Sequence, residues 1–221
     1  MKVKILLLFL IVVFTVFILL NIKKSEYTSE IPKIIHQTAM ADQSKWKQEW
    51  FRCQKSWQEK FPDFEYKMWN DEDLDDFIKT KYPWFYDTYT GYDEKIKRID
   101  AARFFILYEH GGMYADMDFE CFENFWDQIP QDKVSIAKCP KYDANYENAL
   151  MISPKGHSFW EKIFTKLPDR AKMHVYDATG PHLVSETVRE NKSDVNTLKS
   201  EEYSKSDARY SRHLWTQSWV N

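Results

Sequence analysis

The sequence predicts an α/β fold, with a mixed and mainly parallel sheet flanked by helices. Short apolar or alternating runs, which are typical of strands, alternate with longer segments of helical periodicity. The chain has 221 residues, of which 43% are hydrophobic and 17% aromatic, so it can bury one sizeable core. Polar residues follow several predicted strands, and ligands of such sheets bind at the carboxyl ends of strands.

The N-terminus predicts a transmembrane helix that serves as a signal anchor. Residues 5–20 are apolar apart from Thr15. Counted through Ile22, the span has about 18 residues, which corresponds to about 27 Å of helix. No small-x-small cleavage site follows, so a retained anchor is favoured over a cleaved signal. The predicted divisions are an anchor over 1–24, a stem over 25–30 and one domain over 31–221.

Charge and cysteine content narrow the class of protein. A net charge of −3 provides no basic field for nucleic acid. Cys53, Cys121 and Cys139 fit neither a zinc spacing nor a disulfide framework, so buried free thiols are the preferred interpretation. A glycosylation sequon at Asn191 fits a lumenal domain. We therefore expect a single-pass type II membrane protein that faces the Golgi or ER lumen, or the equivalent membrane of a virus or bacterium.

The first elements can be placed in order. Residues 31–35 predict a buried strand that runs into His36-Gln37-Thr38. A helix is predicted over 44–60, because large apolar residues recur at spacings of four, three and four. These expected core residues are Trp46, Trp50, Cys53 and Trp57. Pro62 ends the helix, and residues 64–68 alternate as a second strand.

Helices dominate the next part of the chain. Asn70, just after Trp69, predicts the N-cap of a helix over 71–79. Pro83 predicts a break followed by an aromatic connector that ends near Gly91. The remaining predictions are a helix over 93–110, strands over 134–138 and 149–153, a helix over 158–167, and a polar, mobile surface segment over 190–209.

Two pairs of charged residues carry most of the functional information. Asp100 and Arg103 lie three apart on a predicted helix and therefore share a face. If the chain after Gly111-Gly112 is an extended strand, Asp116 and Asp118 point to the same side. Two carboxylates so placed can hold Mn²⁺ or Mg²⁺, and that cation can neutralise a diphosphate. Alone, such a triplet is more often a solvated turn, and Asp100 with Arg103 a surface ion pair; together they favour a metal site.

A series of motifs resembles glycosyltransferase family 32. These motifs are Ile31-Pro-Lys-Ile-Ile-His-Gln-Thr38, Tyr66-Lys-Met-Trp-Asn-Asp71, Tyr82-Pro-Trp-Phe85, Arg98-x-Asp-x-x-Arg103 and Gly111-Gly-x-Tyr-x-Asp-x-Asp118. The resemblance is dense over 31–125 and patchy beyond, where Ala178-Thr-Gly-Pro181 and His213-Leu-Trp-Thr-Gln-Ser-Trp219 match. The family contains fungal inositol-phosphorylceramide mannosyltransferases and the initiating yeast outer-chain mannosyltransferase. It implies a GT-A-like, Rossmann-related fold and a metal-dependent, retaining hexosyltransferase.

The resemblance also implies roles for the matching positions. Catalytic roles fall on Asp100, Arg103, Asp116 and Asp118. Donor-binding roles fall on His36, Gln37, Thr38, Trp69, Gly112, Tyr114, Ser218 and Trp219. The implied ligands of Mn²⁺ or Mg²⁺ are Asp116, Asp118 and His213. Read from the residues alone, His36 is equally well explained as a satisfied histidine at a strand end.

The implied donor is a nucleotide sugar, with GDP-mannose favoured over a UDP-hexose, and the acceptor is a glycan or a lipid. Phe119-Glu120-Cys121 departs from the acidic, glycine-containing turn of the sphingolipid branch, which leaves both acceptor classes open. One alternative is a catalytically inactive sugar-binding or assembly protein with the same fold. A phosphohydrolase with Asp116 as nucleophile is disfavoured, because a small Thr or Val normally follows such a pair and Phe119 stands here.

Overall fold

The computed structural model describes residues 27–141 and 145–216. The predicted anchor over 1–24 lies outside the described residues, as do Ser218 and Trp219. Within the described part, no helix is both long and apolar enough to span a bilayer.

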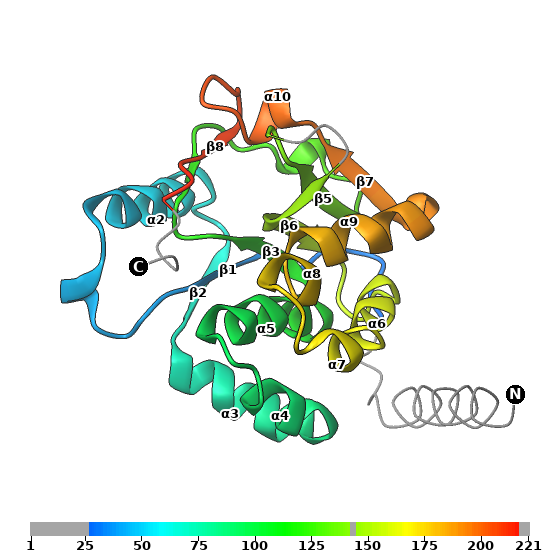
Figure 1. Ribbon diagram of the computed structural model, residues 1–221. Coiled ribbons are helices and arrows are strands. Elements are labelled where there is room, and N and C mark those ends of the chain that lie inside the picture. Colours follow the sequence, from blue (N-terminus) through cyan, green and yellow to red (C-terminus); the bar gives the residue numbers. More distant parts are fainter. Residues whose placement is uncertain (1–26, 142–144, 217–221) are drawn as a thin grey trace, which may run out of the picture.

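A six-stranded sheet forms the centre of the domain, in the order β2-β1-β3-β6-β5-β7 (Figure 1). The pairs β1–β2, β1–β3 and β5–β7 are parallel, whereas β3–β6 and β5–β6 are antiparallel, which confirms a mixed and mainly parallel sheet. The strands are β1 (Ile34–Thr38), β2 (Glu65–Trp69), β3 (Gly112–Ala115), β5 (Val134–Lys138), β6 (Tyr146–Ser153) and β7 (Val195–Leu198). A separate two-stranded sheet pairs β4 (Phe119–Cys121) with β8 (Ser211–His213).

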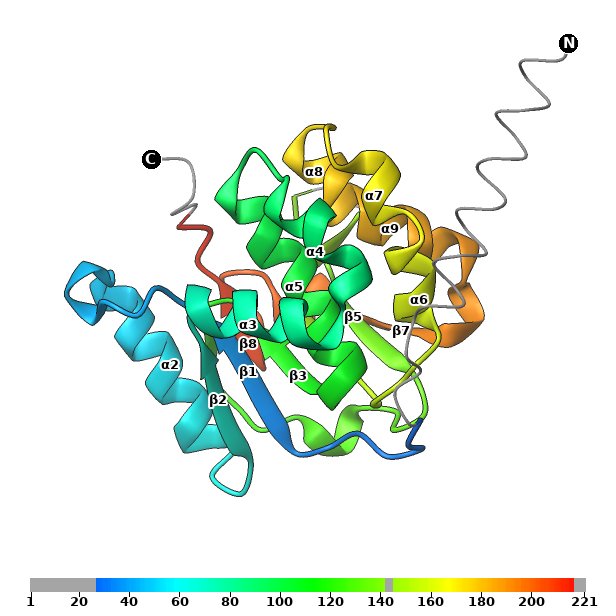
Figure 2. The same cartoon turned by 90° about the horizontal axis from the view of Figure 1, so that it is seen from below.

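Helices cover both faces of the sheet. Helices α3, α4 and α5 lie on one face, and α2 lies on the opposite side of the sheet (Figures 1 and 2). The α-helices are α2 (Gln48–Lys60), α3 (Asp71–Lys81), α4 (Pro83–Thr90), α5 (Lys95–His110), α6 (Phe159–Phe164), α7 (Leu167–Arg170), α8 (Val175–Ala178), α9 (Pro181–Glu190) and α10 (Ser200–Tyr203). Short 3-10 helices are η1 (Gln43–Lys45), η2 (Trp126–Gln128) and η3 (Lys192–Asp194).

The period-two alternation of strand side chains divides the core into two layers. Met113 packs with α2 residues such as Trp57, whereas its neighbour Tyr114 packs with residues of α3 to α6. Leu150 and Met151 divide in the same way. The expected core residues Trp46, Trp50, Cys53 and Trp57 are buried, and all three cysteines are buried, as predicted.

Local sequence signals explain where α3 begins and where α5 is followed by β3. Asn70 begins α3 with a reciprocal capping box, in which Asp73 accepts from the Asn70 backbone. Helix α5 ends at Gly111, and β3 begins at Gly112, whose φ is +88°. A Cβ at Gly112 would lie 2.5 Å from the carbonyl oxygen of Ile34, so only glycine lets β3 pair closely with β1.

Two predictions about secondary structure were wrong. The aromatic stretch after Pro83 forms the helix α4, because proline at the first helical position starts a helix and Phe85 and Tyr89, four apart, are buried together. The polar segment 190–209 contains β7, which pairs with β5, and α10. Buried Leu198 and Tyr203 hold this segment in place despite its polar composition.

The start of α2 also differs from prediction, since Trp46 lies before the helix, which begins at Gln48. Asp116 and Asp118 lie in the turn between β3 and β4 rather than in a strand. The Phe119 N–H donates to the Asp116 carbonyl at 3.0 Å, which closes a four-residue turn. The two carboxylates therefore approach each other through the turn and not through strand alternation.

Candidate functional site

A cleft with a volume of about 620 Å³ opens at the edge of the sheet where the parallel strands β1 and β2 end. Its walls combine the ends of β1 and β2, the start of α5, the turn after β3, and residues from β6, α8, α9 and β8. The predicted residues that line it are Thr38, Trp69, Asp100, Arg103, Asp116, Asp118 and His213. Of the polar residues that follow predicted strands, Thr38, Asp116 and Asp118 thus meet at this edge, together with Trp69.

Arg103 occupies the centre of a buried ionic network. Its Nη2 lies 2.9 Å from an oxygen of Asp100, and its Nη1 lies 3.2 Å from Oδ1 of Asp116. Nη1 also donates to the Asn148 carbonyl at 2.8 Å, and the guanidinium lies over the Tyr114 ring at 4.6 Å. Only 3% of Arg103 is exposed, so this is a buried network and not a solvated surface pair. Such a network is sensitive to the loss of any one charge.

Tyr114 links the first strand to this network. Its hydroxyl group lies 2.8 Å from both the Thr38 hydroxyl and Oδ1 of Asp116. Because Tyr114 is fully buried, it supports Asp116 from below and does not line the cleft.

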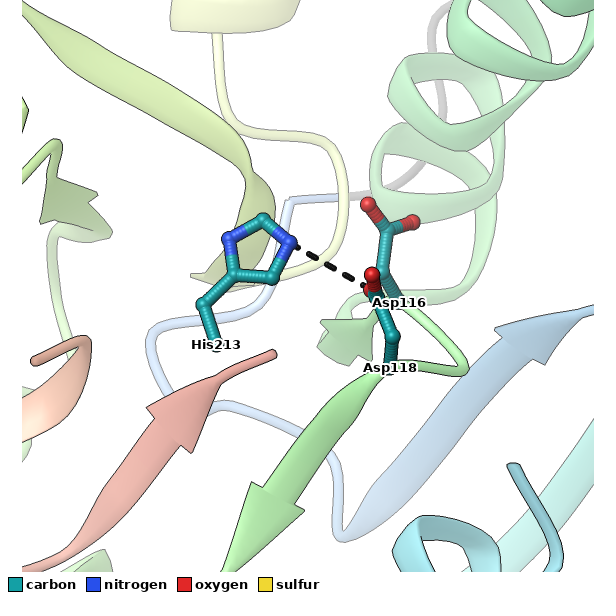
Figure 3. A group of neighbouring side chains, drawn as sticks. All are labelled: Asp116, Asp118 and His213. Atoms are coloured by element: carbon teal, nitrogen blue, oxygen red, sulfur yellow. Dashed lines mark ion pairs between the residues drawn. The ribbon is translucent and has the colours of Figure 1, made fainter. Parts of the chain in front are cut away.

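Asp116, Asp118 and His213 form a group of possible metal ligands (Figure 3). One ligand atom from each lies within 4.8 Å of the other two. His213 comes from β8, where it pairs directly with Phe119, the residue after Asp118. Its Nε2 lies 3.3 Å from Oδ1 of Asp118, close to the spacing of about 3.0 Å expected between adjacent ligands of an octahedral ion with bonds of about 2.1 Å. The residues therefore fit Mn²⁺ or Mg²⁺ in donor chemistry and in spacing.

The C-terminal segment completes the surroundings of Asp118. The backbone N–H and the hydroxyl of Thr216 both donate to Oδ2 of Asp118, at 2.8 and 2.9 Å. Burial disfavours the charged carboxylate, but these bonds and the neighbouring His213 outweigh it and hold the pKa of Asp118 at about 2. Asp118 is therefore ionised and able to serve as a ligand at neutral pH.

Asp100 and Asp116 differ from Asp118, because burial raises the pKa of each of them. Burial raises the pKa of Asp100 to about 7, although the nearby Arg103 works in the opposite direction. Burial likewise raises the pKa of Asp116, again opposed by Arg103. The contact of Asp100 Oδ2 with the Thr179 hydroxyl is long, at 3.5 Å, so this oxygen retains capacity to accept from hydroxyl groups of a ligand.

Four residues with predicted donor-binding roles lie behind the cleft wall, whereas Trp69 lines it; the four are His36, Gln37, Gly112 and Tyr114. Trp69 donates from its indole N–H to Nδ1 of His36 at 3.2 Å, so Nε2 of His36 carries the proton that reaches the Gly111 carbonyl at 3.0 Å. Burial lowers the pKa of His36 to about 3, which keeps the ring neutral. Gln37 donates to the Asp116 carbonyl at 3.2 Å, and Gly112 is needed for strand spacing. His36, Gln37 and Gly112 therefore support the site without lining it.

The cleft also contains residues that motif reasoning missed. Glu147 and Asn148 line it from β6, Trp215 from the C-terminal segment, and Trp50 from α2. Within the described residues, the buried Nε1 of Trp50 and Nε of Arg103 have no hydrogen-bond partner. The polar pair Glu147-Asn148 at the start of an otherwise apolar strand was the available sequence signal, and Trp50 was hidden within the core pattern.

Comparison with known proteins places this geometry in context. Residues 47–136 match the family described as glycosyltransferase sugar-binding region containing DXD motif. The chain is 35% identical over 167 residues to inositol phosphoceramide mannosyltransferase 3 of Schizosaccharomyces pombe. The aligned residues cover 73% of this chain and 46% of the relative. It is 34% identical over 176 residues to mannosyl phosphorylinositol ceramide synthase CSH1 of Saccharomyces cerevisiae, which covers 77% of this chain and 46% of the relative. The chain thus spans about half the length of these relatives.

Two solved structures share the fold. The PaToxG glycosyltransferase superposes with a TM-score of 0.57 at 14% identity, covering 82% of this chain and 77% of that one. A glycosyltransferase involved in glycosylation of the major capsid of PBCV-1 gives a TM-score of 0.53 at 12% identity, covering 84% of this chain and 95% of that one. These likenesses support the predicted GT-A-like arrangement of sheet and helices.

Proposed function

Because the chain belongs to the family of glycosyltransferases whose sugar-binding region contains a DXD motif, we propose that it is a metal-dependent, retaining glycosyltransferase. It transfers a hexose, with mannose favoured, from a nucleotide sugar to a hydroxyl group of a sphingolipid or a glycan. The names of the two yeast relatives, which specify mannose and an inositol-containing ceramide lipid, support GDP-mannose as donor and a sphingolipid as acceptor.

One observation carries this proposal. One possible ligand atom each of Asp116, Asp118 and His213 lies within 4.8 Å of the other two, and the buried pair of Asp100 and Arg103 lies beside them in the same cleft. A nucleotide sugar needs both features, since its diphosphate requires positive charge and its hexose requires directed hydrogen bonds.

The residues divide the work by chemistry. Asp118, Asp116 and His213 would hold Mn²⁺ or Mg²⁺, which when bound supplies positive charge that stabilises a diphosphate leaving group. Asp100 accepts from hexose hydroxyl groups through Oδ2, the oxygen with only a long internal contact. Arg103 fixes the orientation of both Asp100 and Asp116.

The nucleotide fits the part of the cleft at the ends of β1 and β2. Trp69 and Thr38 end the two parallel strands there and line the cleft, together with the apolar Met40 and Leu74. Trp50 also lines the cleft, and its indole N–H has no partner in the described part of the chain. An aromatic and apolar wall with a few polar groups suits a base and ribose.

The contacts of Asp116 argue against a phosphohydrolase. Its Oδ1 accepts from the Tyr114 hydroxyl, and both oxygens lie within 3.4 Å of Nη1 of Arg103. A carboxylate paired with a cation and a hydroxyl is a weaker nucleophile than a free one, whereas its remaining lone pairs still allow Asp116 to bind a metal ion. An inactive sugar-binding protein would keep the same contacts, and turnover separates it from an enzyme.

The proposal is tested with the full chain in detergent. GDP-mannose, UDP-glucose, UDP-galactose and UDP-N-acetylglucosamine are each offered with Mn²⁺ and with a ceramide-linked or glycan acceptor, and nucleotide release is measured. We expect release from GDP-mannose, with the anomeric configuration of the product retained in its NMR spectrum. Binding of a donor without release from any of them would favour the inactive alternative.

We also propose that residues 1–24 anchor the protein as a single-pass type II membrane protein with residues 31–221 in the Golgi or ER lumen, or across the equivalent viral or bacterial membrane. The apolar run over 5–20 and the absence of a cleavage motif after it support a retained anchor. Protease protection of the domain in intact microsomes tests it, and digestion of the domain without detergent would reverse the topology.

A further inference from the structure

Glu147 lies directly behind the histidine of the proposed metal site. Its Oε2 is 3.0 Å from Nδ1 of His213, while Nε2 on the other side of the ring faces Asp118. Glu147 therefore contacts the ring nitrogen that points away from the metal position. It is 3% exposed, so this contact is shielded from water.

The geometry points to Glu147 as the positioning residue for His213, and this inference rests on the metal site of the proposed function. A carboxylate that accepts from Nδ1–H leaves the Nε2 lone pair for a cation and fixes the direction of the ring. Glu147 lies where it can accept from Nδ1–H. It cannot itself bind a cation held by His213 and Asp118, because the imidazole stands between Glu147 and Asp118.

Glu147 is itself held from a second side. The Ser204 hydroxyl donates to its Oε1 at 2.5 Å, and the Ser204 carbonyl accepts the backbone N–H of His213 at 3.1 Å. One buried serine after α10 therefore fixes both partners of the pair. The carboxylate has a defined direction before any ligand arrives, which is what a positioning residue requires.

The faces of the imidazole are fixed as well. The ring of His213 stacks on Phe119 at a centroid distance of 5.0 Å and on Trp215 at 3.9 Å. With aromatic rings stacked against it and carboxylates at both nitrogens, His213 has little freedom to rotate. The orientation of the ring then depends on the hydrogen bond between Nδ1 and Glu147.

The test measures Mn²⁺ affinity of the full chain by the EPR signal of free Mn²⁺. We expect Glu147→Gln to weaken binding by about 10- to 100-fold, because the amide keeps the shape but loses the charge that orients the ring. Ser204→Ala, a milder change, should weaken binding in the same direction by less. Glu161→Gln is the matched control, since Glu161 accepts from the Tyr108 hydroxyl at 2.8 Å and does not line the cleft.

A double-mutant cycle separates positioning from a general structural effect. If Glu147 acts through His213, Glu147→Gln causes no further loss of Mn²⁺ affinity in a His213→Ala background. An equal loss in both backgrounds would overturn the inference, as would unchanged affinity in Glu147→Gln alone. Absence of Mn²⁺ binding by the unaltered chain would instead refute the proposed metal site itself.

Discussion

Replacement of Arg103 by methionine tests the buried network that organises the cleft. Methionine keeps most of the side-chain volume but removes the guanidinium, which leaves Asp100 and Asp116 buried without their cation. Removal of one partner from a buried ion pair typically destabilises a protein by about 3–5 kcal/mol. The loss of stability that Asp116 causes has an upper limit, because a buried carboxylate without its cation becomes protonated. The loss therefore cannot exceed the free energy of that protonation.

That upper limit can be calculated. Protonating Asp116, whose ordinary pKa is 3.8, at pH 7 spans 3.2 pH units, or about 4.4 kcal/mol at about 1.36 kcal/mol per unit. Burial has already raised the pKa of Asp100 to about 7, so Asp100 adds little further loss. Burial has already raised the pKa of Asp116 in the unaltered chain as well, so part of this cost is already present, and we expect Arg103→Met to lower the free energy of unfolding by less than about 4 kcal/mol at pH 7.

The stability lost in Arg103→Met must increase as the pH rises. Since the folded pKa of Asp116 rises above its unfolded value in the variant, stability is fully present below pH 3.8 and is lost as the pH rises through the folded pKa. At pH 5 the upper limit is only about 1.6 kcal/mol, because 1.2 pH units remain.

Urea unfolding at pH 7 and pH 5, followed by tryptophan fluorescence, measures both values. Arg209→Met is the control, because Arg209 pairs with Glu123 on the surface and its loss should change stability by less than about 1 kcal/mol. A loss below about 1 kcal/mol for Arg103→Met, or an equal loss at both pH values, would refute the reasoning.

Three further predictions follow from single positions. Asp118→Asn should reduce nucleotide release by at least about 100-fold, whereas Asp75→Ala, outside the cleft, should leave release unchanged in the same assay. Gly112→Ala should lower the unfolding free energy by about 3 kcal/mol or more in urea, through the positive φ and the 2.5 Å approach to the first strand; Gly156→Ala, at a φ of +71°, should lose only about 1–2 kcal/mol. Hydrogen bonds and charge from a neighbouring arginine and lysine lower the pKa of Glu186 to about 2, so its stabilisation is present above pH 4.5 and lost as the pH falls toward 2; thermal melts of Glu186→Gln and the unaltered chain should differ at pH 7 and converge near pH 2.

Much of the fold was predictable because its signals are local. The cap at Asn70 and the glycines after α5 specify their conformations within a few residues, and both predictions are confirmed. The strand β7 was not predictable in this way, because its pairing with β5 joins residues about 60 apart and its own composition is polar. Helix α4 was missed because Pro83 reads equally as a break and as a helix start.

The candidate site likewise contains residues that local sequence signals predict and residues that only long-range packing brings together. The cluster of Asp100, Arg103, Asp116 and Asp118 follows from spacing, which brings each pair together locally. Glu147 could not be found from a motif, because its role depends on the contact of β6 with β8 residues 66 positions away. The orientation of His36 away from the cleft depends on its partners at Gly111 and Trp69, which only the packed sheet reveals.

The central claim is that a divalent cation joins the carboxylates of the turn after β3 to the diphosphate of a nucleotide sugar. A crystal of the protein grown with Mn²⁺ and GDP tests this claim most directly through the anomalous signal of manganese. The account predicts one strong peak within about 2.3 Å of an oxygen of Asp118 and of a diphosphate oxygen. Nucleotide bound in the cleft with no manganese beside Asp118 would contradict it.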